Sequence, residues 1–268
     1  MRHKYIYTHI LFLLFCFTSY SYAQNELTVI KEINVQADKI YSDHIGNFYV
    51  LHQETLTKYD SLGTKSYTYS NLQYGNISHV DVSNPLKILI FFKDFNSILY
   101  LDKTLSPQGG IIDLNHLTSL SSLVCSSYQN GIWLYEPLNS EMIRYNQNFK
   151  ISSRSGNIQM QLGEVVQPTE MQEVSNRIYI TTTKGFFVFD RYGAFIKTYP
   201  FSDAKCLHVI NENLFFLKGK NLHSYNTKTL EHTILDISEF DAEFITFDGS
   251  YLYLYTKKKI NIILINNY

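Results

Sequence analysis

The chain has 268 residues, of which 18% are charged and 15% are aromatic, with 22 tyrosines and 18 phenylalanines. Its formal net charge is −1 at pH 7, which excludes a broad basic surface for nucleic acid or an anionic membrane. Tyr, Phe, Ile and Thr favour strands, and Ala-rich or Glu/Lys-rich helical blocks are absent. The composition therefore favours an all-β protein.

The first 23 residues have the three parts of a secretory signal peptide. Residues 1–4 give a basic start, residues 10–17 form an apolar segment, and Ser21 and Ala23 place small side chains at the two cleavage positions. We therefore expect cleavage before Gln24 and export to the periplasm or cell surface of a Gram-negative bacterium.

Two other interpretations of this segment remain open. A retained membrane anchor would need about 20 apolar residues to span a bilayer, and the apolar run is shorter than that. A lipoprotein signal at Cys16 would need a small residue before the cysteine, where this chain has Phe15. No later apolar run is long enough for a membrane span.

From residue 24 onward the chain repeats a unit of short strands and tight turns. Residues 176–200 show the unit clearly, with predicted strands at 178–182, 186–189 and 194–199. The second turn of each unit begins with an aromatic or aliphatic residue followed by Asp or Asn. These pairs are Tyr59-Asp60, Leu101-Asp102, Tyr145-Asn146, Phe189-Asp190, Tyr225-Asn226 and Ile265-Asn266. The successive Asp or Asn positions are 42, 44, 44, 36 and 40 residues apart, a period typical of β-propeller blades.

The two ends of the chain complement each other. The sixth unit stops at residue 268 without a fourth strand, whereas residues 26–35 supply a spare strand ahead of the first unit. Pairing the two would close the ring and cover two exposed strand edges. The sequence therefore predicts that residues 24–268 form a single six-bladed β-propeller of four-stranded blades, closed by the N-terminal strand.

The period, the strand order and the aromatic–Asp turn resemble those of secreted six-bladed propellers of the NHL type, over essentially the whole mature chain. The Trp-Asp ending of WD repeats, the double glycine of kelch blades and the Asp box of sialidase-like blades are absent. The resemblance implies an architecture rather than a particular activity.

Two cysteines remain once the signal peptide is removed, Cys125 and Cys206. Each lies in the predicted first strand of its unit, and the two units are not neighbours. We therefore expect two unpaired, small buried side chains rather than a disulfide.

Four carboxylates lie near the first strand or first turn of their units: Asp43, Asp81, Glu173 and Asp248. Oxygen ligands that converge from several blades could bind calcium in the central channel, as in propeller hydrolases and lactonases. Carboxylates at turns more commonly accept hydrogen bonds from backbone amides, which is the interpretation we favour.

Few residues are candidates for catalysis. His79, two residues before Asp81, and His208 on the equivalent strand of the fifth unit could act as general bases across the channel. A structural role is more common for isolated histidines on inner strands. The chain has no His-x-x-x-His or Cys-x-x-Cys pair, no Gly-x-Ser-x-Gly motif and no phosphate-binding loop. We therefore assign no catalytic residue and expect no cofactor.

The longest connection between units, residues 153–169, carries several apolar side chains. Such a loop could cover the channel or contact a partner, and Phe95 lies in another candidate loop. The partner-binding candidates are Met160, Leu162, Val165, Val166 and Phe95.

The sequence thus predicts an exported, non-enzymatic propeller that acts, as a monomer, as a scaffold for an envelope protein. One alternative is a calcium-dependent hydrolase or lyase with its site in the central channel. Another is a sensor domain that binds carbohydrate or peptide through exposed aromatic residues. Oxygen ligands converging near the axis would favour the enzyme.

Overall fold

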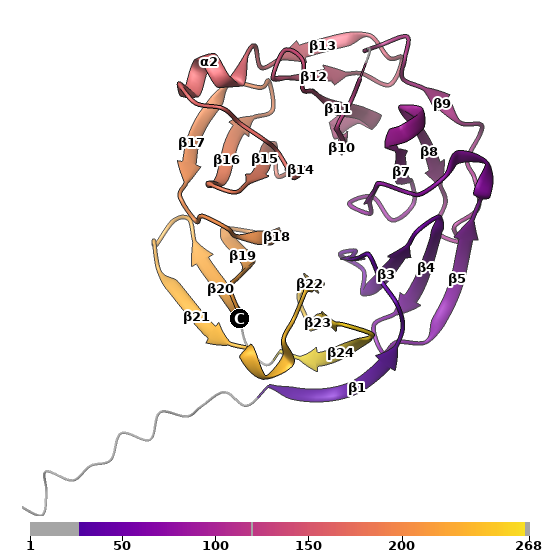
Figure 1. The fold of residues 1–268 in the computed structure, drawn as a ribbon, viewed down its shortest axis with the longest axis vertical. Coiled ribbons are helices and arrows are strands. Elements are labelled where there is room, and N and C mark those ends of the chain that lie inside the picture. Colours follow the sequence, from indigo (N-terminus) through magenta and orange to yellow (C-terminus); the bar gives the residue numbers. More distant parts are fainter. Residues whose placement is uncertain (1–26, 119, 266–268) are drawn as a thin grey trace, which may run out of the picture.

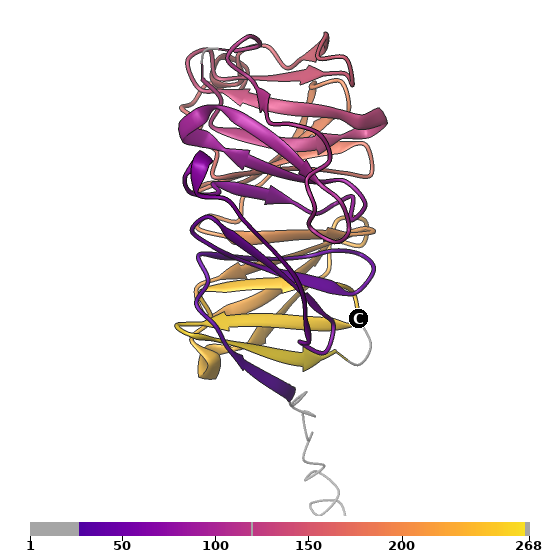
Figure 2. The same cartoon turned by 90° about the vertical axis from the view of Figure 1, so that its right-hand side faces the viewer.

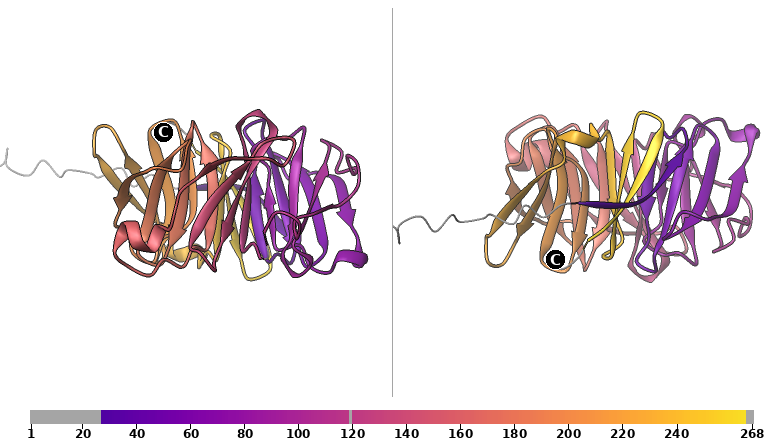
Figure 3. Two further views of the ribbon diagram at one scale, coloured as in Figure 1. Left: turned by 90° about the horizontal axis from the view of Figure 1, so that it is seen from above. Right: turned by 90° about the horizontal axis from the view of Figure 1, so that it is seen from below.

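A computed structural model describes residues 27–118 and 120–265 of the chain. Six antiparallel sheets of four strands each surround a central axis (Figure 1), so the predicted all-β, six-bladed propeller is confirmed. Figures 2 and 3 show the ring from its edges, with the strands running through its thickness. The predicted signal peptide, residues 1–23, lies outside the described residues.

Each blade contains four strands in the order in which they pair, from the channel outward. Blade 1 contains β2 (Lys39–Ser42), β3 (Asn47–His52), β4 (Thr55–Asp60) and β5 (Lys65–Ser70). Blade 2 contains β6 (His79–Asp81), β7 (Ile88–Phe92), β8 (Ser97–Leu101) and β9 (Ile112–Asp113). Blade 3 contains β10 (Leu123–Ser127), β11 (Gly131–Glu136), β12 (Glu141–Tyr145) and β13 (Ile151–Arg154).

The second half of the chain repeats this arrangement. Blade 4 contains β14 (Glu170–Val174), β15 (Arg177–Thr182), β16 (Gly185–Asp190) and β17 (Phe195–Tyr199). Blade 5 contains β18 (Lys205–Ile210), β19 (Asn213–Lys218), β20 (Asn221–Asn226) and β21 (His232–Asp236). Blade 6 contains β22 (Phe244–Phe247), β23 (Tyr251–Thr256), β24 (Lys259–Leu264) and the N-terminal β1 (Thr28–Asn34).

The hydrophobic core lies between neighbouring blades. Every residue of β7 and of β11 is buried, because both faces of these strands pack against another blade. At the junction of blades 1 and 6, for example, the Phe48 ring packs 4.9 Å from the Tyr59 ring of its own blade and 4.5 Å from the Tyr253 ring of the other. This arrangement explains the uniformly apolar second strand of each unit.

The turn after the third strand is held by the Asp or Asn that marks the repeat. Oδ1 of Asp190 accepts hydrogen bonds from the amides of Tyr192, at 2.8 Å, and Ala194, at 2.9 Å. Asp60, Asp102 and Asn146 accept the same pair of bonds, and Asn226 accepts two in a turn that is one residue longer. These bonds explain why Asp or Asn occupies this position in five of the units, and the sixth, Asn266, lies outside the described residues.

The N-terminal strand completes blade 6. β1 pairs antiparallel with β24, and Asn34 lies opposite Lys259. Beyond the ladder, the Val35 amide bonds the Lys258 carbonyl at 2.9 Å. On the side of blade 1, a Cβ atom at Gly63 would clash with Cδ1 of Ile33, so β1 packs tightly against the neighbouring blade.

Helical segments are short in the described ranges. The 3₁₀ helices are η1 (Leu72–Tyr74), η2 (Lys93–Phe95), η3 (Tyr128–Asn130) and η4 (Ser238–Phe240), and the α-helix is α2 (Ile158–Leu162). None of the described helices is long and apolar enough to cross a membrane. Cys125 and Cys206 are both free, as expected.

The structure corrects the expectation for residues 153–169. The segment begins inside β13 and then forms α2, because the Asn157 side chain caps the amide of Met160 at 2.8 Å and Gly163 ends the helix with φ 67°. Figure 1 places α2 on the outer rim of the ring beside β13 and β17, so the helix does not cover the channel.

Candidate functional site

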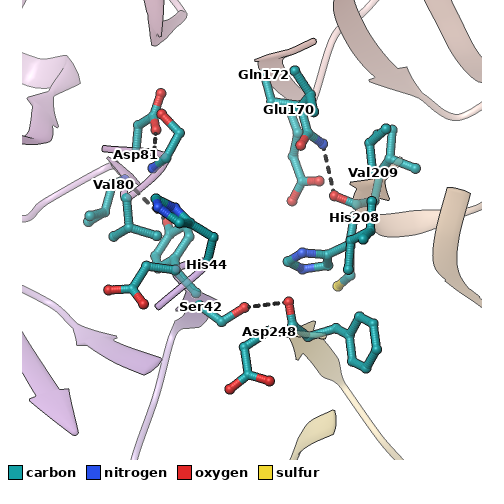
Figure 4. Close-up of a pocket in the computed structure, with 18 of the residues that line it drawn as sticks. Ser42, His44, Val80, Asp81, Glu170, Gln172, His208, Val209 and Asp248 are labelled. Atoms are coloured by element: carbon teal, nitrogen blue, oxygen red, sulfur yellow. Dashed lines mark hydrogen bonds between the residues drawn. The ribbon is translucent and has the colours of Figure 1, made fainter. Parts of the chain in front are cut away.

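A cavity of about 540 Å³ lies at the centre of the ring and is called the central pocket here. Its walls come from β2, β6, β14, β18 and β22, the inner strands of five blades, and from the turns that follow them. In Figure 4, His44 and Asp81 face this space from one side, and Glu170, Gln172 and His208 face it from the other. The fold thus brings together inner-strand residues that are far apart in the sequence.

All four predicted carboxylates line the central pocket, but their oxygens accept hydrogen bonds from the ring itself. Asp43 accepts from the Ile45 and Asn47 amides, at 3.1 and 2.9 Å, and from the Tyr49 hydroxyl, at 2.8 Å. Asp248 repeats the pattern in blade 6, where it accepts from the Tyr253 hydroxyl at 2.7 Å. These two carboxylates hold a turn and a buried tyrosine in place.

The other two carboxylates connect neighbouring blades. Oδ2 of Asp81 accepts the Ser126 amide at 2.6 Å. Oε2 of Glu173 accepts the Ser127 hydroxyl at 2.5 Å and the Trp133 indole N–H at 2.9 Å. All three bonds tie blade 3 to a neighbouring blade. Across residues 27–118 and 120–265, no group of three or more His, Cys, Asp or Glu side chains is arranged to hold a metal ion.

The two histidines singled out from the sequence both line the central pocket. Burial lowers the pKa of His79 to about 4, helped by the charge of Lys39 and opposed by Asp81. Burial likewise lowers the pKa of His208 to about 4, opposed by a hydrogen bond to the backbone of Ile245. Both imidazoles are therefore neutral at pH 7 and can each donate and accept a hydrogen bond.

An ion pair crosses the channel at one end. Nζ of Lys39, at the start of β2, lies 3.8 Å from Oε1 of Glu170, at the start of β14. The two strands belong to blades 1 and 4, which face each other across the ring (Figure 1). This pair narrows the central pocket at that end, and the turns that begin at Asp43 and Asp248 surround the other end. The sequence alone did not indicate this contact, because nothing local marks either residue.

A second cavity, of about 520 Å³, adjoins the first and is called the side pocket here. It lies between blades 2, 3 and 4 and shares Ser83, Glu173 and Ser175 with the central pocket. Its other lining residues come from the turns between the first and second strands of these blades and from the strands beside them. Sequence reasoning missed it, since it exists only where three blades meet.

The partner-binding candidates from the sequence are divided between surface and core. Met160, Val165 and Phe95 are exposed, at 84%, 65% and 50% of their surface. Val166 is buried and Leu162 packs against the core between blades 3 and 4. None of the five lines the central pocket or the side pocket.

Comparison with known proteins gives no family assignment. No family model matches the chain, and no curated protein matches it.

Solved structures do match. Virginiamycin B lyase from Staphylococcus aureus aligns with a TM-score of 0.60 and 14% identity over 90% of this chain and 100% of its own. The Neurospora crassa Pan2 WD40 domain gives 0.59 and 9% over 85% of this chain and 78% of its own. The extracellular domain of a putative one-component system from B. thetaiotaomicron gives 0.55 and 12%, over 85% of this chain and 33% of its own.

At these identities the likeness concerns the fold alone. The matched proteins include a lyase, a WD40 domain and an extracellular domain, so the same ring supports different functions. This chain has the architecture of a repeat propeller, in agreement with the NHL-type resemblance of its sequence.

Proposed function

We propose that this protein acts by binding rather than by catalysis, as an exported interaction domain of the cell envelope whose ligand site is the central pocket. The observation that carries the proposal is the cavity itself, about 540 Å³ in volume and narrowed at one end by the Lys39–Glu170 pair. A cavity of this volume is within the range of small-molecule sites.

The lining indicates the kind of ligand. The His79 and His208 imidazoles are neutral, and Lys39 and Glu170 offset each other's charge. The carboxylates already accept hydrogen bonds from the ring. Apolar side chains such as Val80 and Val209 form other parts of the wall. A small, moderately polar organic molecule without negative charge fits this lining best.

Trp133 provides a readout, because it is the single tryptophan of the chain and donates its indole N–H to Glu173, which lines the pocket. The experiment titrates the purified 24–268 chain with a panel of neutral dipeptides and a panel of neutral disaccharides. Binding is followed by tryptophan fluorescence and calorimetry. The variant His208→Phe keeps the bulk of the pocket wall but removes its hydrogen-bonding groups, and His116→Phe, on an 86% exposed side chain, is its control.

We expect saturable binding of at least one of these probes, weakened about tenfold or more by His208→Phe and unchanged by His116→Phe. A complete absence of saturable binding across the panels would contradict the proposal. So would equal effects of the two substitutions.

A lyase with its site in the same pocket is the second candidate function. Two observations favour it: the pocket holds two neutral imidazoles that can accept a proton, and the fold matches that of streptogramin B lyases. Quinupristin is the compound present in a solved structure of virginiamycin B lyase. Its conversion by this protein, followed by chromatography and abolished in His79→Gln and His208→Gln, would show that the protein is a lyase rather than a binding domain.

A protein partner in the envelope belongs to the first proposal. The exposed candidates Met160, Val165 and Phe95 offer apolar surface for it, away from both cavities. Export rests on residues 1–23, and the expectation of a monomer rests on the closed ring.

A further inference from the structure

The Tyr128 ring, in one wall of the side pocket, lies between two guanidinium groups. Cζ of Arg144 is 3.5 Å from the ring centroid, and Cζ of Arg191 is 3.9 Å from it. Two groups this close to one centroid would overlap on the same face, so they occupy opposite faces. Each guanidinium is attracted by the electron-rich face of the ring, but two cations held around one ring also repel each other.

Arg144 is a fixed part of this stack. Only 3% of the residue is exposed, and it donates to the Ser127 hydroxyl at 2.8 Å, the Ser152 hydroxyl at 2.7 Å and the Tyr128 carbonyl at 2.5 Å. Ser127 in turn donates to Glu173, which offsets the Arg144 charge through one hydroxyl group. A Cβ atom at residue 131 would lie 2.9 Å from Nη2 of Arg144, so Gly131 makes room for the guanidinium.

The positive charge of Arg191 is not offset in this way. Within the described ranges it forms no ion pair, and its buried Nε has no hydrogen-bond partner. Its position beside the side pocket follows from the strand register, in which Arg177 pairs with Asp190. Arg191 therefore lies next to Asn176, which lines the side pocket.

A third cation, Lys87, lines the side pocket itself. Its Nζ lies 4.0 Å from the centroid of the Tyr100 ring, and Lys87 too has no ion-pair partner among the residues that the structure describes. Burial lowers its pKa below the usual value, as expected for an ammonium group without a counter-ion. Lys87 therefore lines the side pocket without a counter-ion, and Arg191 lies beside the pocket, against the Tyr128 ring of its wall.

The rest of the lining is polar and uncharged, apart from Glu173. It consists mainly of serine hydroxyls and of side-chain amides from the turns of three blades. The amide-bearing residues are Asn84, Gln129, Asn130 and Asn176. Such groups hydrogen-bond sugar hydroxyls, whereas a docked peptide would need apolar pockets for its side chains.

We propose that the side pocket binds an acidic saccharide, with Arg191 and Lys87 holding its carboxylate or sulfate groups and the turn amides holding its hydroxyls. A guanidinium presents paired N–H groups that match a carboxylate or sulfate. This site is independent of the ligand proposed for the central pocket, although the two cavities share part of the wall.

The test uses digalacturonate and its methyl ester, which has the same sugar rings without the negative charges. Calorimetric titrations compare the 24–268 chain with Arg191→Gln, Lys87→Gln and Lys228→Gln. Lys228 is the matched control, because it lies in the equivalent third-strand turn of blade 5, away from the side pocket. The dipeptide Glu-Glu serves as the acidic peptide probe, and circular dichroism verifies that each variant is folded.

We expect digalacturonate to bind at least about tenfold more tightly than its methyl ester. Arg191→Gln and Lys87→Gln should each weaken digalacturonate binding by about tenfold or more, and added salt should weaken it further. Lys228→Gln and the central-pocket variant His208→Phe should leave digalacturonate binding unchanged. The side-pocket proposal and the proposed function of the central pocket can therefore be rejected independently of each other.

Three results would overturn the proposal. Equal affinity for the acid and its ester would show that charge is not recognised. Equal effects of Arg191→Gln and Lys228→Gln would show that the site lies elsewhere. Binding of Glu-Glu as tight as that of digalacturonate would show that the pocket selects acidic groups without recognising a sugar.

Discussion

Asp43 and Asp248 stabilise the fold at positions where the sequence would equally allow a calcium ligand. Each holds a tyrosine hydroxyl, of Tyr49 or Tyr253, whose side chain has no exposed surface. Loss of the carboxylate would leave that hydroxyl buried without a partner, which costs about 1–3 kcal/mol. The sequence could not separate this role from calcium binding, because both use an aspartate at the end of an inner strand.

The two neutral histidines of the central pocket predict how stability depends on pH. Because the pKa of His79 and of His208 falls from the usual value near 6.5 to about 4 on folding, the unfolded chain takes up protons at a higher pH than the folded one. The free energy of unfolding is therefore highest above about pH 6.5, and it decreases as the pH falls towards 4. Urea unfolding at a series of pH values measures this slope.

The double variant His79→Gln/His208→Gln should flatten the slope by at most about 1.4 kcal/mol per pH unit for each histidine. His223, whose pKa is also lowered, stays in both proteins and leaves some slope behind. His116→Gln is the control, since that side chain is 86% exposed. An unchanged slope in the double variant would show that the pocket histidines are not buried as neutral groups.

At the scale of elements, the features that the sequence predicted are local ones. The second strands are apolar on both faces, and the third-strand turns carry an Asp or Asn that bonds amides two and four residues later. The two cavities could not be predicted in the same way. Their walls join residues from different blades, such as Lys39 with Glu170 and Ser127 with Glu173, and no local pattern marks such pairs.

In the segment after β13, one feature was predicted from the sequence and another was not. The apolar residues were recognised, but α2 was not expected, because the helix has only five residues and its one strong signal is the Asn157 cap. The tertiary packing of Ile158 and Leu162 against the core between blades 3 and 4 stabilises it.

Two adjacent valines in this segment allow a matched test. Val166→Ala should lower the free energy of unfolding by about 2 kcal/mol, because Val166 is buried. Val165→Ala should change it by less than about 0.5 kcal/mol, because that side chain is 65% exposed. Chemical denaturation measures both values. Equal losses in the two variants would contradict the placement of this segment against the ring.

At the scale of the whole molecule, the ring depends on the contact between β1 and blade 1. Gly63 has φ +76°, and a Cβ atom there would clash with Ile33 of β1. Gly219 has φ +60° but nothing within 4 Å of its Cβ position. A substitution at either glycine would therefore strain the backbone. Only a substitution at Gly63 would also clash with a neighbouring side chain.

Gly63→Ala should accordingly cost more stability than Gly219→Ala, for which the backbone term alone is about 1 kcal/mol. Thermal and urea denaturation measure the two losses. In an Ile33→Ala background the difference between them should shrink, since the clashing methyl group is gone. If the difference persists in that background, the tight packing of β1 on blade 1 is wrong.

The pairing of β1 with β24 also determines when the molecule can be completed during synthesis. Blades 1 to 5 are each built from consecutive strands, so each can pair within itself as soon as its own residues have left the ribosome. Blade 6 needs Thr28–Asn34 and Lys259–Leu264 together, which closes a loop of nearly the entire chain. Until then β1 exposes an unpaired strand edge and blade 1 exposes the apolar face around Phe48, and both favour aggregation. We therefore expect truncated or stalled chains to be the species most in need of chaperones.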